Sequence, residues 1–176
     1  TAGASPRPTE NQMYSVRCEI LRCAQNDSLY TPTVGRGLAP AALKGKNDMK
    51  VLYVSSEALP FMASGGLADV AGSLPQALRK RLIGCRVVMP LYDGIRQELK
   101  DTMTFLTSIS VPVAWRRQYC GIFEAKANGV IYYLLDNQYY FKRDGIYGYY
   151  DDAERFAFFS RAVLEMLPHI DFKPDI

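Results

Sequence analysis

The chain carries, in order, a short apolar run, a pair of glycines and an amphipathic stretch, and this order restricts its fold more than any other feature. Residues 51–55 are apolar on both faces, as is typical of a strand buried in a parallel sheet. Ser64-Gly65-Gly66 follows, and the residues after it have helical periodicity. The order predicts a strand, a glycine turn and a helix, which together form one unit of an α/β fold.

The glycine turn suits an anionic ligand. Gly65 and Gly66 lack Cβ atoms, so a ligand can approach the main chain, and the free N–H groups that begin a helix attract a phosphate. The spacing is not Gly-x-Gly-x-x-Gly, and it lacks the Lys-Ser/Thr ending of a P-loop. The pattern therefore disfavours a dinucleotide-binding fingerprint and an NTPase.

The rest of the chain alternates between strand and helix signals. Residues 86–89 predict a second buried strand that ends at Pro90. The helix after the glycine turn has one apolar stripe: Leu67, Val70, Ala71, Leu74 and Leu78. A closing helix is indicated by another apolar set: Phe156, Phe159, Val163, Met166 and Leu167. Residues 174–176 are typical of the approach to a further strand.

The middle of the chain is rich in β-formers. Residues 109–115, 119–126 and 130–135 predict strands, and Asn128-Gly129 between the last two is a strong hairpin signal. We expect these strands to form a small antiparallel insertion or edge. The predicted fold is a Rossmann-like parallel sheet with a β-hairpin insertion.

Composition narrows the class of protein. With 176 residues, 48% hydrophobic content and a formal charge of +3, the chain predicts one globular domain. Acidic and basic residues are interspersed, so no nucleic-acid partner is expected, and no stretch is apolar enough to span a membrane. The four cysteines have no disulfide or zinc spacing and are expected to be free thiols, with no metal site. We expect a cytoplasmic protein, or a plastid one if the source is a plant.

One boundary is visible along the chain. Residues 1–48 lack sustained periodicity, whereas periodic order begins at Met49. We expect 1–48 to be an irregular prefix that is non-native or disordered, and 49–176 to be the folded domain, incomplete at its carboxyl-terminal end.

Four ordered segments resemble one family of enzymes. They are Met49 to Glu57 with Pro60-Phe61 and Ser64 to Pro75, then Arg86 to Tyr92, then Tyr140 to Gly148, and finally Asp151 to Ala162. In their residues and in their order along the chain, these segments resemble the amino terminus of bacterial glycogen synthases and plant starch synthases. The resemblance covers residues 49–176.

This resemblance implies a fold and a reaction. The fold is the amino-terminal half of a GT-B glycosyltransferase, whose carboxyl-terminal domain supplies further donor-binding residues. The reaction is transfer of glucose from ADP-glucose to the 4-hydroxyl of an α-1,4-glucan with retention, without a metal or other cofactor. The family's cleft histidine and Asp-Trp pair follow the segment that Pro174-Asp175-Ile176 resembles, so no catalytic residue is assigned within this chain. We expect the chain alone to be inactive.

The donor side of the site is expected around the glycine turn. The family usually has a phosphate-binding lysine where this chain has Ala63. Ser64, Gly65 and Gly66 could still donate neutral hydrogen bonds to a phosphate, although a charge-assisted bond is stronger. Asp69, in the first helical turn, either binds sugar or nucleotide hydroxyls or caps the helix.

Three residues are candidates for the sugar or acceptor. Glu57 follows the first strand, where ligands of α/β sheets gather, and it faces either the sugars or the nearby main chain. Tyr147 either contacts the acceptor or packs in the core. Asp151 matches a family aspartate near the glucose pocket.

Two other functions stay open at this level. One is a module that binds α-glucan without transferring glucose, and the other is an unrelated flavodoxin-like nucleotide binder. Maltooligosaccharide binding by this chain favours the first, and nucleotide or flavin binding without glucan affinity favours the second.

Overall fold

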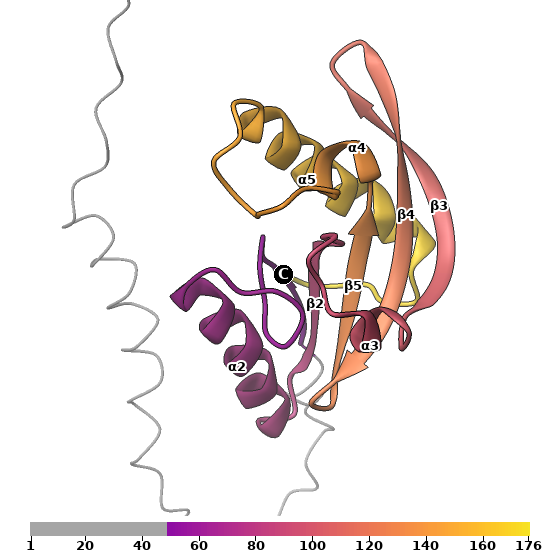
Figure 1. Cartoon of the computed structure of the whole chain (residues 1–176). Coiled ribbons are helices and arrows are strands. Elements are labelled where there is room, and N and C mark those ends of the chain that lie inside the picture. Colours follow the sequence, from indigo (N-terminus) through magenta and orange to yellow (C-terminus); the bar gives the residue numbers. More distant parts are fainter. Residues whose placement is uncertain (1–48) are drawn as a thin grey trace, which may run out of the picture. The chain divides into compact units, whose positions relative to one another are not determined.

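The computed structural model describes residues 49–176, and the predictions made for residues 1–48, Cys18 and Cys23 lie outside them. Figure 1 shows the arrangement of the elements. The strands are β1 (Lys50–Val54), β2 (Gly84–Pro90), β3 (Thr104–Val113), β4 (Arg116–Ala127) and β5 (Val130–Asp136). The helices are α2 (Gly66–Lys80), α3 (Gln97–Lys100), α4 (Gln138–Phe141), α5 (Asp152–Met166) and the short 3-10 turn η1 (Leu167–His169).

The strands form one five-stranded sheet in the order β1-β2-β5-β4-β3. β1 pairs with β2 and β2 with β5 in parallel, whereas β4 pairs antiparallel with both β5 and β3. The predicted parallel sheet with a β-hairpin addition is therefore confirmed. The assignment of residues 130–135 to the antiparallel part alone was wrong, because β5 lies in the centre and also pairs in parallel with β2.

Two turns shape the antiparallel part. Asn128 and Gly129 have φ values of 50° and 75°, which a two-residue hairpin turn of type I′ requires, so the predicted turn is confirmed. β3 ends at Val113, and the predicted strand residue Trp115 lies instead in the β3–β4 turn beside Ala114, whose φ is 51°. This turn projects beyond the rest of the sheet (Figure 1).

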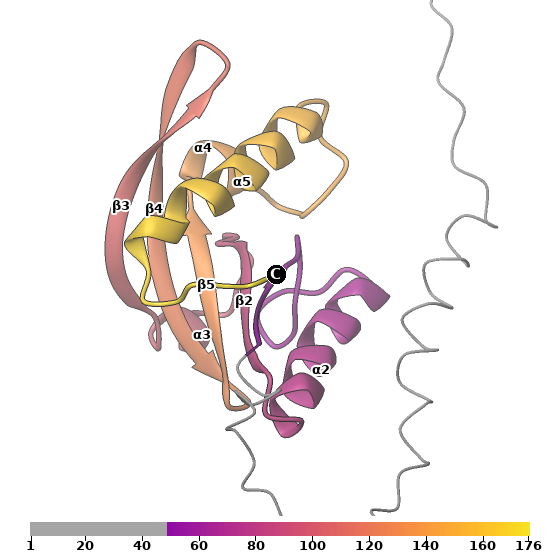
Figure 2. The same cartoon turned by 180° about the vertical axis from the view of Figure 1, so that it is seen from behind.

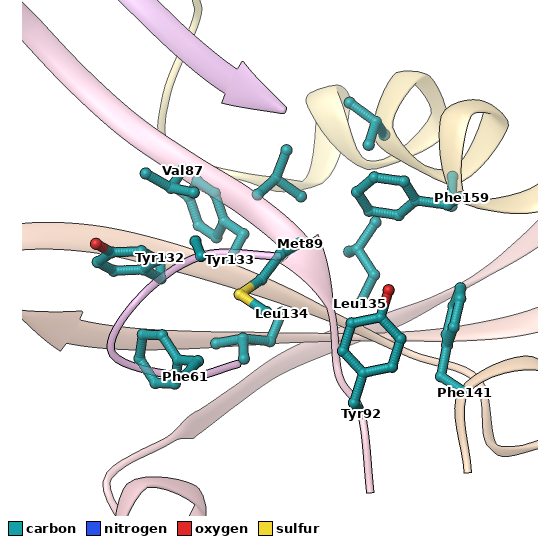
Figure 3. Close-up of a cluster of buried hydrophobic side chains, with 14 of the residues drawn as sticks. Phe61, Val87, Met89, Tyr92, Tyr132, Tyr133, Leu134, Leu135, Phe141 and Phe159 are labelled. Atoms are coloured by element: carbon teal, nitrogen blue, oxygen red, sulfur yellow. The ribbon is translucent and has the colours of Figure 1, made fainter. Parts of the chain in front are cut away.

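The two central parallel strands are buried on both faces. Val87, Val88 and Met89 of β2 have no exposed surface, and residues 132–135 of β5 are equally buried. Figure 3 shows Phe61, Tyr92 and Phe159 packed around them, from the loop after β1, the loop after β2 and helix α5. Continuous apolar runs therefore formed central strands, as the sequence predicted.

Helix α2 buries only part of its apolar stripe. Ala71 is buried as the stripe predicts, but Leu67 and Val70 are each 46% exposed. The other buried residues of the helix are Ala68, Gly72 and Pro75. A Cβ on Gly72 would lie 2.9 Å from the Cβ of Leu59, so a small residue is needed where the helix meets the loop after β1. Close backbone approach, rather than hydrophobicity, thus selects the packed face.

Helix α5 lies across the sheet and packs against β3, as seen from behind in Figure 2. Phe159, Val163 and Met166 are buried and Phe156 packs against the core, as predicted. Leu167 follows in η1 rather than in α5 itself.

The last residues run beside β1. Leu52 N–H donates to the Ile176 carbonyl over 2.8 Å, and Ile176 N–H donates to the Lys50 carbonyl over 3.2 Å. This alternation is that of a parallel pair. The predicted approach of residues 174–176 to a strand is therefore confirmed at Ile176.

Candidate functional site

The candidate site lies at the edge of the sheet where the parallel strands end. Because β1, β2 and β5 run in the same direction, the loops that follow them meet at one edge. The Tyr92 hydroxyl, after β2, donates to the Ser56 carbonyl, after β1, over 2.8 Å. The Ser56 hydroxyl in turn lies 2.6 Å from the Tyr147 hydroxyl. These bonds bring the loop that carries Glu57 next to the loop that carries Tyr147.

Glu57 holds the loop between β1 and α2. Its buried carboxylate accepts a hydrogen bond from the Ser64 backbone N–H, and its carbonyl accepts one from the Ser55 hydroxyl over 2.6 Å. Of the two roles weighed for Glu57, the main-chain bond is therefore present. A contact with sugars stays a prediction.

The glycine turn leaves its N–H groups free. Gly65 is the N-cap residue of α2 and has no side chain to cap the helix. Within residues 49–176, the N–H groups of Gly65, Gly66 and Leu67 have no hydrogen-bond acceptor. Free N–H groups at the start of a fifteen-residue helix carry partial positive charge and bind anions.

Space above these amides is open. An added Cβ at Gly65 or at Gly66 would meet no atom within 4 Å, and both residues are exposed together with Ala63 and Ser64. Neither glycine has a positive φ, so backbone strain does not require them. Open space beside unpaired amides is the geometry that a phosphate group needs.

Asp69 does not cap the helix. It is exposed in the first turn of α2, and within the described part of the chain its carboxylate has no hydrogen-bond partner. The capping alternative is therefore wrong. Binding of ligand hydroxyls by Asp69 stays a prediction.

Asp151 is held by a basic residue. Arg143 donates to both carboxylate oxygens over 2.6 and 2.7 Å, and also to the Tyr139 carbonyl over 3.1 Å. The bidentate bond from Arg143 lowers the pKa of the Asp151 carboxyl. This carboxylate therefore anchors the loop between α4 and α5, and a direct contact with sugar stays a prediction.

Tyr147 lies in that loop. It is 45% exposed, and its ring centre lies 5.8 Å from that of Phe156. The ring thus packs partly against α5 while its hydroxyl reaches Ser56. Both predicted roles, packing and acceptor contact, are compatible with this position.

A buried arginine, which the sequence analysis missed, organises the same loop. Arg155 has no exposed surface, and it donates to the Tyr140 carbonyl over 2.8 Å and to the Ile146 carbonyl over 3.0 Å. It also forms an ion pair with Asp152. The spacing of Asp152 and Arg155, three residues apart at a helix start, was the available signal.

Asp152 completes this anchor. Its carboxylate accepts the Gly148 N–H over 2.8 Å and the Tyr149 N–H over 3.2 Å. These bonds and the ion pair with Arg155 lower the pKa of the Asp152 carboxyl despite its partial burial. Because both N–H groups directly follow Tyr147, Asp152 positions that side chain.

The thiols and metal-ligating side chains of the described region form no further site. Cys85 and Cys120 are free, as predicted for these two thiols, and both are buried. Within residues 49–176, no group of His, Cys, Asp and Glu side chains could hold a metal ion. Nor does this region contain a helix with the length and apolar character to cross a membrane.

Comparison with known proteins gives consistent matches. The family model described as the starch synthase catalytic domain matches residues 50–176. A glycogen synthase of Bacillus cereus (strain B4264) is 53% identical over 128 residues, which are 73% of this chain and 27% of that protein. A glycogen synthase of Geobacillus thermodenitrificans (strain NG80-2) is 58% identical over 128 residues, or 73% of this chain and 26% of that protein.

A solved structure agrees with these relatives. The catalytic domain of starch synthase IV from Arabidopsis thaliana, bound to ADP and acarbose, superposes with a TM-score of 0.67 at 28% identity. The match covers 73% of this chain and 27% of that one. The chain thus spans about a quarter of the length of these relatives. An unrelated flavodoxin-like protein is excluded, and the chain belongs to the starch synthase catalytic-domain family of glycosyltransferases.

Proposed function

We propose that this chain provides the donor-phosphate side of a glycogen or starch synthase. The reaction is transfer of glucose from ADP-glucose to the non-reducing 4-hydroxyl of an α-1,4-glucan, with retention of configuration. Family membership supports the reaction class, and the open space above the unpaired amides of Gly65 and Gly66 is the observation that carries the proposal.

In this proposal the glycine turn stabilises the departing diphosphate. Negative charge grows on that group as the bond between glucose C1 and the phosphate oxygen breaks, and oriented N–H groups stabilise such charge without reorganising. Ser64 adds a hydroxyl donor, whereas Ala63 contributes no charge. Asp69 binds ligand hydroxyls beside the turn.

The acceptor glucan lies along the loop between α4 and α5, which carries Tyr147. Tyr147 presents a half-exposed ring to it, and the pairs Arg143–Asp151 and Arg155–Asp152 hold that loop in place. Glu57 supports the glycine turn through Ser64. A second, carboxyl-terminal domain closes the cleft and supplies further donor-binding residues, and the family's cleft histidine and Asp-Trp pair, which follow the segment that residues 174–176 resemble, complete the site. The cytoplasmic location stays a prediction.

The test is an NMR titration of the 176-residue chain with ADP and with ADP-glucose. We expect the largest amide shifts at Gly65, Gly66 and Leu67. Shifts confined to other residues would contradict the assigned donor site.

A second assay tests whether this chain alone has synthase activity. We expect the purified chain to incorporate no labelled glucose from ADP-glucose into glycogen, because the reaction also requires the family's cleft histidine and Asp-Trp pair and the donor-binding residues of the second domain. Incorporation by this chain alone would contradict that part of the proposal.

A further inference from the structure

A polar groove with aromatic walls lies beside the end of β5, apart from the glycine turn. One depression of about 430 Å³ is lined by Tyr119, Tyr139 and the polar residues around them. A second, of about 260 Å³, adjoins it, and both share Asp136 and Gln138. Together they fall in the size range of small-molecule sites, roughly 300–1,000 Å³.

The ring of Tyr119 forms a platform in this groove. Its hydroxyl lies only 2.7 Å from where a Cβ on Gly121 would stand, and the Asp136 Cβ lies 3.3 Å from the same point. Tyr119 and Gly121 are two residues apart on β4 and so share one face of the sheet. The missing Cβ lets the ring extend along the strand over Gly121, beside Asp136. Because Tyr119 is 52% exposed, the ring keeps a large apolar surface toward solvent.

The polar groups of the groove divide into supporting and free ones. Asn137 is a supporting residue, since its amide donates to the Tyr119 carbonyl over 2.7 Å and accepts the Tyr140 N–H over 3.0 Å. Asp136 and Gln138 are free, because their side chains have no hydrogen-bond partner within residues 49–176. Partial burial also raises the pKa of the Asp136 carboxyl. The Asp136 carboxylate, which accepts hydrogen bonds, and the Gln138 amide, which donates and accepts them, thus line the same depression as Tyr119 and Tyr139.

We propose that this groove binds glucose units of an α-linked glucan at a site separate from the donor-phosphate turn. A sugar ring has a C–H face that packs on an aromatic ring, and its hydroxyls pair with carboxylate and amide groups. Tyr119 and Tyr139 provide the aromatic surfaces, and Asp136 and Gln138 provide the hydrogen bonds. The choice of an α-linked glucan among sugar polymers rests on the proposed function. A glucan held here stays at the sheet edge where the acceptor is used.

The test is an NMR titration of the 176-residue chain with maltoheptaose, with cellohexaose as the control sugar. We expect maltoheptaose to shift amides of residues 118–121 and 136–139, and cellohexaose to bind more weakly. Tyr119→Ala and Tyr139→Ala should each weaken maltoheptaose binding about threefold to tenfold, as loss of one aromatic contact predicts. Trp115→Ala removes an exposed ring that lines neither depression and should leave the affinity unchanged.

A further variant keeps the ring but moves it. Gly121→Ala places a Cβ against the far end of the Tyr119 side chain, so it should displace the platform and weaken binding while Tyr119 is retained. The dispersion of the amide spectrum of each variant verifies its fold. Shifts elsewhere only, equal affinity for both sugars, or unchanged affinity in the folded Tyr119 and Tyr139 variants would each overturn the inference.

The donor titration separates this inference from the proposed function. If ADP shifts Gly65 to Leu67 but maltoheptaose shifts nothing beside β5, the groove inference fails and the donor site stands. If maltoheptaose binds the groove but ADP shifts nothing at the glycine turn, the groove stands and the donor site fails.

Discussion

The buried carboxylate of Glu57 accepts a hydrogen bond from the backbone N–H of Ser64, which joins the end of β1 to the start of α2. This bond occupies the N–H just before the glycine pair and leaves those of Gly65 and Gly66 unpaired in the described region. Glu57 therefore fixes the backbone directly before the amides that remain available to a ligand.

Replacement of Glu57 should loosen this turn. Glu57→Ala removes a hydrogen bond to a charged group, which contributes about 1.5–3 kcal/mol, whereas Glu57→Gln keeps an acceptor and should cost about half as much. Urea denaturation measures both changes. Equal stability of Glu57→Ala and the wild-type chain would show that the bond contributes nothing.

Substitution of Gly66 should affect ligand binding, whereas substitution of Gly72 should affect stability. Gly66→Val adds atoms to open space, so the free energy of unfolding should change by less than about 1 kcal/mol while ADP binding weakens about tenfold. Gly72→Ala instead pushes a Cβ into Leu59 and should cost about 1–3 kcal/mol. Thermal unfolding and ADP titration of both variants check this contrast, and strong destabilisation by Gly66→Val would refute it.

Ala63→Lys should strengthen ADP-glucose binding. The ammonium would add a charge-assisted contact to a diphosphate that otherwise meets neutral donors, and a gain of about 1 kcal/mol corresponds to about fivefold. Calorimetry measures the affinity, and Ala63→Gln controls for side-chain length. An unchanged affinity in Ala63→Lys would indicate that another group already neutralises the phosphate.

Loss of Arg155 should destabilise the domain. Arg155→Met removes three hydrogen-bonded contacts from the interior and leaves Asp152 without its counter-ion, at a cost of about 3 kcal/mol. Arg155→Lys keeps the charge but cannot reach both carbonyls at once, so it should restore only part of the stability. Arg161→Ala, which breaks an exposed pair with Glu165 on the same helix, should change stability by no more than about 0.5 kcal/mol. Similar losses in the Arg155 and Arg161 variants, measured by chemical denaturation, would contradict the anchoring role.

Acid should weaken the loop that carries Tyr147. The pKa values of Asp151 and Asp152 lie below their ordinary value of 3.8, so both carboxylates contribute stability above that pH and lose it as the pH falls through their lowered values. Unfolding midpoints, measured between pH 6 and pH 2, should decrease once the pH is below about 4. Arg143→Gln should make this drop smaller, because the Asp151 pKa then returns toward its ordinary value. An acid profile that Arg143→Gln leaves unchanged would count against this account.

Part of the candidate site could be predicted from local sequence patterns. Gly65 and Gly66 were assigned to a phosphate-binding turn from their place between a strand and a helix, and the structure leaves both amides open. The roles of the candidate sugar-binding and acceptor-binding residues were harder to predict. Asp151 proved to be engaged by Arg143, and the loop depends on Arg155. The three-residue spacing of Asp152 and Arg155 indicates their ion pair, but not the burial of Arg155, which arises where the loop before α5 places the Tyr140 and Ile146 carbonyls against it.

The sequence by itself determined the central strands, the two long helices and one hairpin turn. Apolar runs made the central strands, Asn128-Gly129 made the hairpin turn, and four ordered motifs identified the family, since each of these signals is carried by neighbouring residues. The tertiary structure decided which distant segments meet. It placed β5 between β2 and β4, turned the small face of α2 rather than Leu67 and Val70 toward Leu59, and extended Tyr119 over Gly121. The physical reason is that close packing and long-range hydrogen bonding select among faces and partners that local periodicity leaves equivalent.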